Sequence, residues 1–117
     1  MKKFASLILL TTVLITSCAD SNETIVGKWE RITKDSKSYF ELKMDNTFNG
    51  KSVRDGIDWE YSGTWALDGK TLIWTYTYSS WDAVEPGLVD KDTIKVTADT
   101  LEAKAENGSV YVYKRVD

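Results

Sequence analysis

Apolar and polar residues alternate through residues 57–78, the most regular stretch of the chain. In residues 57–67 the odd positions are nearly all apolar, whereas the even positions are polar except for Ala66. Side chains of a β-strand point alternately to its two faces, so this pattern predicts a strand with one buried and one solvated face. Asp68-Gly69 follows and is typical of a two-residue hairpin turn whose central residues both take positive φ. Residues 72–78 alternate again and predict the second strand. The residues expected to face inward are Ile57, Trp59, Tyr61, Gly63, Trp65, Leu67, Leu72, Trp74, Tyr76 and Tyr78.

Shorter alternating stretches on both sides of this hairpin predict further strands. They cover residues 25–33, 39–44, 47–54, 89–96, 101–105 and 110–116, with turn residues at 34–36, Asp45-Asn46, Asp55-Gly56, Asp99-Thr100 and Asn107-Gly108. Residues 79–87, which include Pro86, break the pattern and predict the longest loop. Short links favour pairing between consecutive strands, and closure removes the two exposed edges of an open meander. The sequence therefore predicts an all-β, eight-stranded antiparallel up-and-down barrel, with room inside for side chains or one small ligand.

The amino-terminal residues have the pattern of an export signal. Lys2 and Lys3 precede an apolar run over residues 4–15, which is too short to span a bilayer comfortably. The end of this run, Ile15-Thr16-Ser17-Cys18, resembles a bacterial lipobox. That resemblance implies cleavage before Cys18 and attachment of acyl chains, palmitate among them, to its sulfur and amino group. The alternative interpretation is an ordinary secretory signal followed by an incidental thiol.

Charge and cysteine content narrow the partners of the mature chain. Removing residues 1–17 from the 117 residues leaves 100, which is enough for one domain, and the loss of two lysines changes the net charge from −3 to −5. An acidic chain without a basic run is a poor nucleic-acid binder, so membrane attachment is expected through the acyl chains, of which several anchor stably. Cys18 is the single cysteine, so no internal disulfide can form.

Few residues suit catalysis or metal binding. The chain contains no histidine, which is the usual general base near neutral pH and the commonest metal ligand. Asp58 and Glu60 share the polar face of a strand, where solvation is the simplest interpretation. Asp90 and Asp92 could supply oxygen ligands to a hard cation, but the glycine and the spacing of a calcium loop are missing. We therefore expect no enzymatic activity, no cofactor and no metal site.

The aromatic residues are the candidate ligand-binding groups. The candidates are Trp59, Tyr61, Trp65, Trp74, Tyr76 and Tyr78 on the inward faces of the hairpin, together with Trp81 in the long loop. Such rings can fill a small core by themselves, or they can line an open pocket together with a few polar groups. Trp81 allows two interpretations as well: a residue at the rim of the open end, or a lid that folds back onto the barrel.

Two short motifs connect this pattern to a known family. Gly27-Lys28-Trp29 resembles the Gly-x-Trp motif of the lipocalin superfamily, and Arg115 stands where that family places an arginine over the tryptophan ring. Gly63-Thr64-Trp65 and the Tyr-x-Tyr-Lys-Arg ending are similar to short lipocalin-like domains of bacterial lipoproteins. The resemblance implies that Gly27, Trp29 and Arg115 close one end of the barrel. The chain departs from larger lipocalins because it has no disulfide pair and no predicted helix after the barrel.

Together, these features divide the chain into a lipoprotein signal peptide (residues 1–17), a lipidated tether (18–24) and a lipocalin-like barrel domain (25–117). The expected protein is anchored to a bacterial membrane, by resemblance the outer one, with its domain outside the cytoplasm. Its expected function is to bind a small hydrophobic or amphipathic ligand in the barrel. The alternative is a solid barrel that serves as an envelope protein-interaction or inhibitor module.

Overall fold

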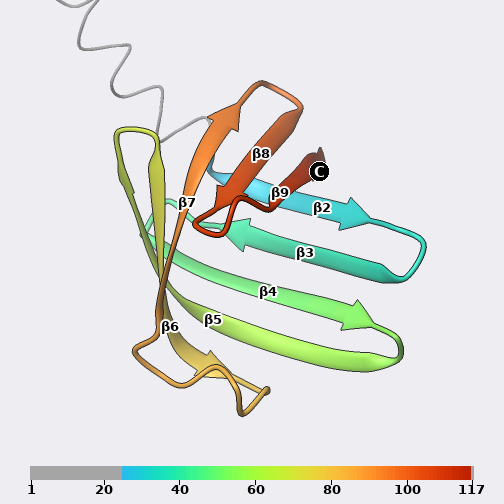
Figure 1. Cartoon of the computed structure of the whole chain (residues 1–117). Helices are drawn as coiled ribbons and strands as arrows, with labels where there is room; N and C mark the ends of the chain where they lie inside the picture. Colours follow the sequence, from blue (N-terminus) through green and yellow to red (C-terminus); the bar gives the residue numbers. More distant parts are fainter. Residues whose placement is uncertain (1–24, 117) are drawn as a thin grey trace, which may run out of the picture.

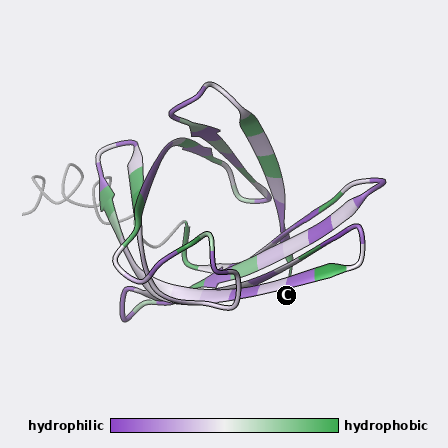
Figure 2. Cartoon of the chain, turned by 60° about the horizontal axis from the view of Figure 1, so that its bottom comes forward, coloured by the Kyte–Doolittle hydropathy of each residue, from purple (hydrophilic) through white to green (hydrophobic). Residues whose placement is uncertain are grey.

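The computed structural model describes residues 25–116, which form one closed antiparallel barrel of eight strands (Figure 1). The strands are β2 (Gly27–Ile32), β3 (Ser36–Leu42), β4 (Thr47–Arg54), β5 (Ile57–Asp68), β6 (Thr71–Ser79), β7 (Val89–Val96), β8 (Thr100–Ala105) and β9 (Val110–Val116). Each strand pairs with the next, and β9 returns to pair with β2. The predicted all-β, eight-stranded antiparallel up-and-down barrel is thus confirmed, and Figure 2 shows its strands from a second side. Cys18, the signal peptide and the boundaries predicted near residues 17 and 24 lie outside the described residues.

The hairpin turns follow from residues that tolerate positive φ. Asp55 and Gly56 take φ values of 52° and 81°, and Asn46 takes 68°. The turn after β5 lies one residue later than predicted, because Asp68 pairs with Thr71 and leaves Gly69 and Lys70 as its central residues. Of these two, Gly69 has positive φ (63°), which corresponds to a type II′ turn rather than type I′. Within residues 25–116, no helix has the length and apolar character needed to cross a membrane.

A β-bulge interrupts the alternation of β6. Gly63 pairs with Tyr76, whereas the adjacent Ser62 pairs with Tyr78, so Thr77 is an extra residue in β6. The extra residue turns Tyr78 to the outer face, where it is 52% exposed, and brings Ser79 opposite Tyr61. The inward placement predicted for Tyr78 is therefore wrong. Beyond it, the alternation no longer follows odd and even numbering from Leu72.

Two further apolar residues of predicted strands, Ile57 and Met44, lie at or beyond strand ends and are exposed. Ile57 is 70% exposed and is the first residue of β5, directly after the turn at Asp55-Gly56. Met44 is 77% exposed because β3 ends at Leu42 and Met44 belongs to the following turn.

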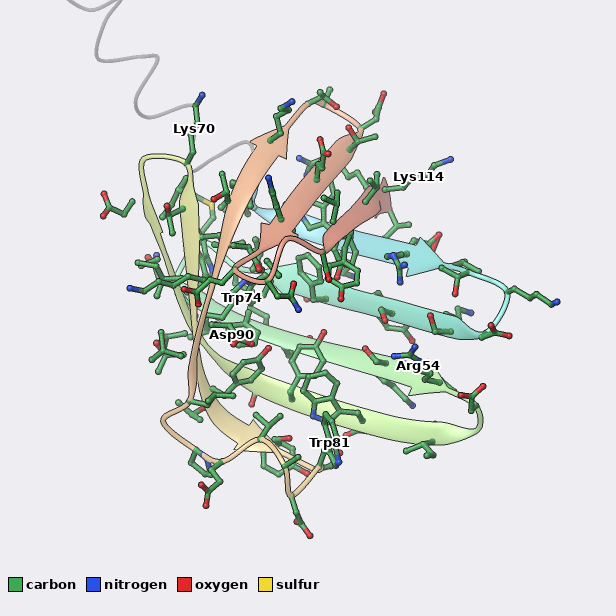
Figure 3. The ribbon with its side chains drawn as sticks, in the orientation of Figure 1. Arg54, Lys70, Trp74, Trp81, Asp90 and Lys114 are labelled. Atoms are coloured by element: carbon green, nitrogen blue, oxygen red, sulfur yellow. The ribbon has the colours of Figure 1, made fainter. Side chains whose placement is uncertain are left out.

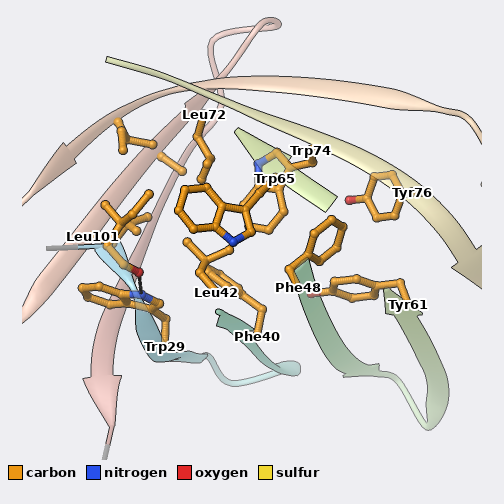
Figure 4. Packing of buried hydrophobic residues seen from close by; sticks show 13 residues of the cluster. Trp29, Phe40, Leu42, Phe48, Tyr61, Trp65, Leu72, Trp74, Tyr76 and Leu101 are labelled. Carbon is orange, nitrogen blue, oxygen red and sulfur yellow. Dashed lines mark hydrogen bonds between the residues drawn. The ribbon is translucent and has the colours of Figure 1, made fainter. Parts of the chain in front are cut away.

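The apolar core fills one end of the barrel, which we call the closed end (Figure 4). Its fully buried side chains are Trp29, Phe48, Ile25, Leu42, Leu72 and Leu101. Burial of each such side chain contributes about 1.5–3 kcal/mol. Trp65 completes this core, and its Nε1 donates to the Lys43 carbonyl oxygen at 3.0 Å. Since these rings and methyl groups occupy the closed end, any open interior space lies toward the opposite end.

Trp29 and Arg115 lie together at the closed end, as the resemblance implies. The two residues are direct partners across β2 and β9, and the Arg115 guanidinium carbon lies 4.2 Å from the indole centroid. Arg115 Nη1 donates to the Val26 carbonyl oxygen at 2.9 Å, and Nε donates to the Ala98 carbonyl oxygen at 2.8 Å. A Cβ at Gly27 would lie 2.6 Å from Arg115 Nη1, so glycine leaves the space that the guanidinium needs.

Candidate functional site

The open half of the barrel contains a cavity of about 1080 Å³. Five of the seven candidate aromatic residues line it: Trp59, Tyr61, Trp74, Tyr76 and Trp81. Trp65 does not, because it lies in the filled closed end and is only 4% exposed. Tyr78 does not either, because the bulge turns it outward. The cavity is thus formed by the half of the hairpin that lies away from the Gly69 turn.

Ring-to-ring contacts hold the aromatic residues of the cavity in place. Trp59 and Tyr61 have centroids 4.3 Å apart, and Tyr61 meets Tyr76 at 5.8 Å in an edge-on arrangement. On the other side, Phe40 lies edge-on to Trp74 at 5.1 Å and to Tyr113 at 4.8 Å. Edge-to-face pairs of this kind contribute about 0.5–1.5 kcal/mol beyond burial. A ligand would therefore meet a lining of rings that is largely arranged in advance.

Trp81 lies at the mouth of the cavity, and Ser79 holds it there. The Trp81 ring meets Trp59 edge-on at 5.7 Å, yet it remains 55% exposed, as expected for a rim residue rather than a closed lid. Ser79 Oγ accepts hydrogen bonds from Trp59 Nε1 at 2.7 Å and from the Trp81 backbone N–H at 3.1 Å. The β6 bulge therefore has two effects. It turns Tyr78 away from the cavity, and it turns Ser79 inward, where Ser79 holds Trp81 at the mouth of the cavity.

The cavity also contains polar groups that the sequence did not single out. Ser52 Oγ donates to Ser38 Oγ at 3.0 Å, and both serines line the cavity. Burial raises the pKa of the Tyr61 hydroxyl far above its usual range, so this hydroxyl stays neutral. Arg31 lies over the Tyr111 ring at 5.1 Å. Arg54 lines the cavity as well (Figure 3).

Two carboxylates on β7 face the same interior. Asp90 pairs with Trp74, and Asp92 pairs with Leu72, so both share the inner face of the barrel wall and line the cavity. Trp74 Nε1 donates to Asp92 Oδ2 at 2.9 Å. Burial raises the pKa of the Asp92 carboxyl, and the charges of Asp90 and Glu106 raise it further, while the indole hydrogen bond opposes them. In residues 25–116, no three side chains of the metal-binding types gather into a metal site.

Some of these missed residues carried a signal in the sequence. Phe40 stands at an apolar alternating position of the half-buried strand predicted over residues 39–44, and Tyr113 at an alternating position of the strand predicted over residues 110–116, so parity was the signal for both. Asp90 and Asp92 share the parity of Ile94, which is buried. Asp90 and Asp92 were nevertheless missed, because charged residues prefer solvent and this preference does not distinguish the outer surface from a solvated cavity.

No protein family model matches the chain, and no curated protein shows significant similarity. Among solved structures, the chain is similar to a lipocalin-like protein from Bacteroides uniformis, with a TM-score of 0.47 and 13% sequence identity. The match covers 80% of this chain and 99% of that chain. The closed barrel itself is established by the pairing of its strands.

Proposed function

We propose that this protein binds one small amphipathic molecule inside its barrel. The observation that carries the proposal is the cavity of about 1080 Å³, lined by aromatic rings and a few polar groups. Small-molecule sites in proteins are typically concave, mostly apolar and about 300–1,000 Å³ in volume. The filled closed end and the open half together favour this function over the solid interaction module, which would need no interior space.

The lining favours a ligand with ring systems or other flat apolar surfaces over a plain hydrocarbon chain. Trp59, Trp74 and Tyr76 offer faces and edges of rings, whereas Ser38 and Ser52 offer hydroxyl groups on the neighbouring strands β3 and β4. A buried polar group of the ligand would find hydrogen-bond partners there, which a purely apolar ligand would leave unused.

We propose a binding role without catalysis. The sequence contains no histidine, and the buried phenols of Tyr61 and Tyr76 have pKa values raised far above neutral pH. Burial is the main cause for both residues, so neither hydroxyl can act as an ionised nucleophile or base under ordinary conditions.

We further propose that acyl chains on Cys18 anchor the protein to a bacterial membrane, with the outer membrane favoured and the domain outside the cytoplasm. Ile25 belongs to the closed-end core, and its carbonyl oxygen accepts the Trp29 indole hydrogen bond at 2.9 Å. A seven-residue tether spans at most about 25 Å when fully extended. An anchor joined at this end would leave the cavity mouth directed away from the lipid, toward ligands dissolved in the aqueous phase.

Native mass spectrometry of the protein purified from its own cells tests the binding function. We expect a fraction of the protein to carry a constant additional mass, beyond the acyl chains, that is released when the protein is denatured. Bare protein in repeated gentle preparations, without any releasable mass, would contradict the proposal.

A further inference from the structure

We propose that the cavity ligand carries a positively charged group, such as an ammonium, which is received by Asp90, Asp92 and the hydroxyl of Tyr76. This inference rests on the proposed binding function and names the chemical class of the ligand. Its apolar part would lie against the rings of the cavity, and its charged part would lie at the β7 wall.

The two carboxylates are placed to contact a molecule inside the barrel. Both lie on the inner face of β7, where Asp90 is the direct neighbour of Trp74 (Figure 3). Asp92 pairs with Ala105 on the other side. Ala103 and Ala105 have small side chains, so β8 leaves space beside the carboxylates. The Trp74 indole N–H donates to Oδ2 of Asp92, whereas within residues 25–116 no hydrogen bond reaches Oδ1 of Asp92.

Tyr76 provides an independent indication of a ligand at this position. Its side chain is 8% exposed, it lines the cavity, and its hydroxyl points into the interior (Figure 4). Across the described part of the chain, this hydroxyl has no hydrogen-bond partner. Buried polar groups are normally paired, so an unpaired one that is directed into a cavity marks a place where a ligand can bond. Asp90 and Asp92 both help to raise the pKa of this phenol, which shows that their charges act on the same region.

The charges around this region leave the carboxylates without a cationic partner. Within residues 25–116, neither Asp90 nor Asp92 forms an ion pair with a lysine or arginine. Arg31 lies over Tyr111 instead. Asp92 is half-buried, whereas Asp90 is exposed, so the absence of a counter-ion is unfavourable for the Asp92 carboxylate, and a ligand cation would remove that cost. The rings of Trp74, Tyr76 and Tyr113 would add cation–π attraction, so the site favours a cation over a neutral group of the same shape.

Isothermal titration calorimetry with three indoles of similar shape tests the charge preference on the mature protein. The probes are tryptamine (cationic), 3-ethylindole (neutral) and indole-3-propionate (anionic). We expect tryptamine to bind at least tenfold more tightly than 3-ethylindole, and indole-3-propionate to bind most weakly. Combining D90N and D92N should weaken tryptamine at least tenfold and remove its advantage over 3-ethylindole, while asparagine at position 92 can still accept the Trp74 indole hydrogen bond.

The control variant is D68N, which removes the same charge at the turn of the closed end, outside the cavity lining. It should leave the affinity for tryptamine unchanged, and circular dichroism should show that all variants are folded. Equal affinity for tryptamine and 3-ethylindole would overturn the charge inference and leave the binding function standing. Preference for indole-3-propionate would overturn it as well and would point to Arg31 and Arg54. Binding of none of the three would also count against it, while the releasable mass in native spectra judges the binding function separately.

Discussion

Replacing Trp29 by alanine is expected to lower the free energy of unfolding by about 4 kcal/mol. Trp29 is 0% exposed, its Nε1 donates to the Ile25 carbonyl oxygen at 2.9 Å, and the Arg115 guanidinium carbon lies 4.2 Å from its ring. Truncating a buried tryptophan costs about 3–5 kcal/mol, because the cavity adds to the lost burial. The expected loss lies above the lower end of that range, because Ile25 is itself 1% exposed and its carbonyl oxygen would lose its indole partner.

Urea denaturation at 25 °C, followed by far-UV circular dichroism, measures this loss. A loss of that size corresponds to a fall of about 15–30 °C in the thermal midpoint of a domain of this length. Trp81→Ala is the control, because that ring is 55% exposed, and it should change stability by less than about 1 kcal/mol. A loss below about 1 kcal/mol for Trp29→Ala would refute the assignment of Trp29 to closure of the barrel.

Three further changes have defined outcomes. Gly63→Ala should destabilise the barrel by about 2–3 kcal/mol in the same urea assay, because the new Cβ would overlap the Thr75 carbonyl oxygen at the bulge; a neutral result would contradict this close approach. Cys18→Ser should abolish incorporation of labelled palmitate and release the protein from the membrane fraction, whereas continued labelling would exclude this cysteine as the acylation site. Burial raises the pKa of Tyr113 to about 12, so the unfolded chain loses protons first, and stability should fall as the pH rises from about 10 to about 12. Urea midpoints that stay constant from pH 9 to 11 would argue against burial of this phenol.

Strand number and order were predictable because burial is one-sided in each strand and nearly every link is a short hairpin. The bulge at Thr77 was not, because threonine is an ordinary strand residue and nothing in its neighbours requires an extra position there. One inserted residue moves Tyr78 to the outer face and Ser79 to the inner face. Parity along a strand is therefore reliable only up to the first irregularity.

Parity also does not tell how deep along the barrel an inward residue lies. Trp65 and Trp74 both face inward and are paired with each other, but Trp65 fills the closed end while Trp74 lines the cavity. The barrel is filled where several strands contribute large apolar side chains at the same level along its axis, and the cavity lies where they do not. Leu42, Leu72 and Leu101 meet at the closed end, whereas Ser38 and Ser52 stand at the level of Trp59.

Titration with the neutral fluorescent dye N-phenyl-1-naphthylamine tests the central claim most directly, with two tryptophan substitutions on adjacent residues of β4. Ser52 lines the cavity, whereas Lys51 points to the outer face, so Ser52→Trp places a large ring in the space of the ligand and Lys51→Trp adds the same ring outside the cavity. The account predicts saturable binding of one dye molecule to the natural protein and to Lys51→Trp, and loss of binding in Ser52→Trp. Equal dye binding by both variants, or no binding by the natural protein, would contradict a ligand cavity inside the barrel.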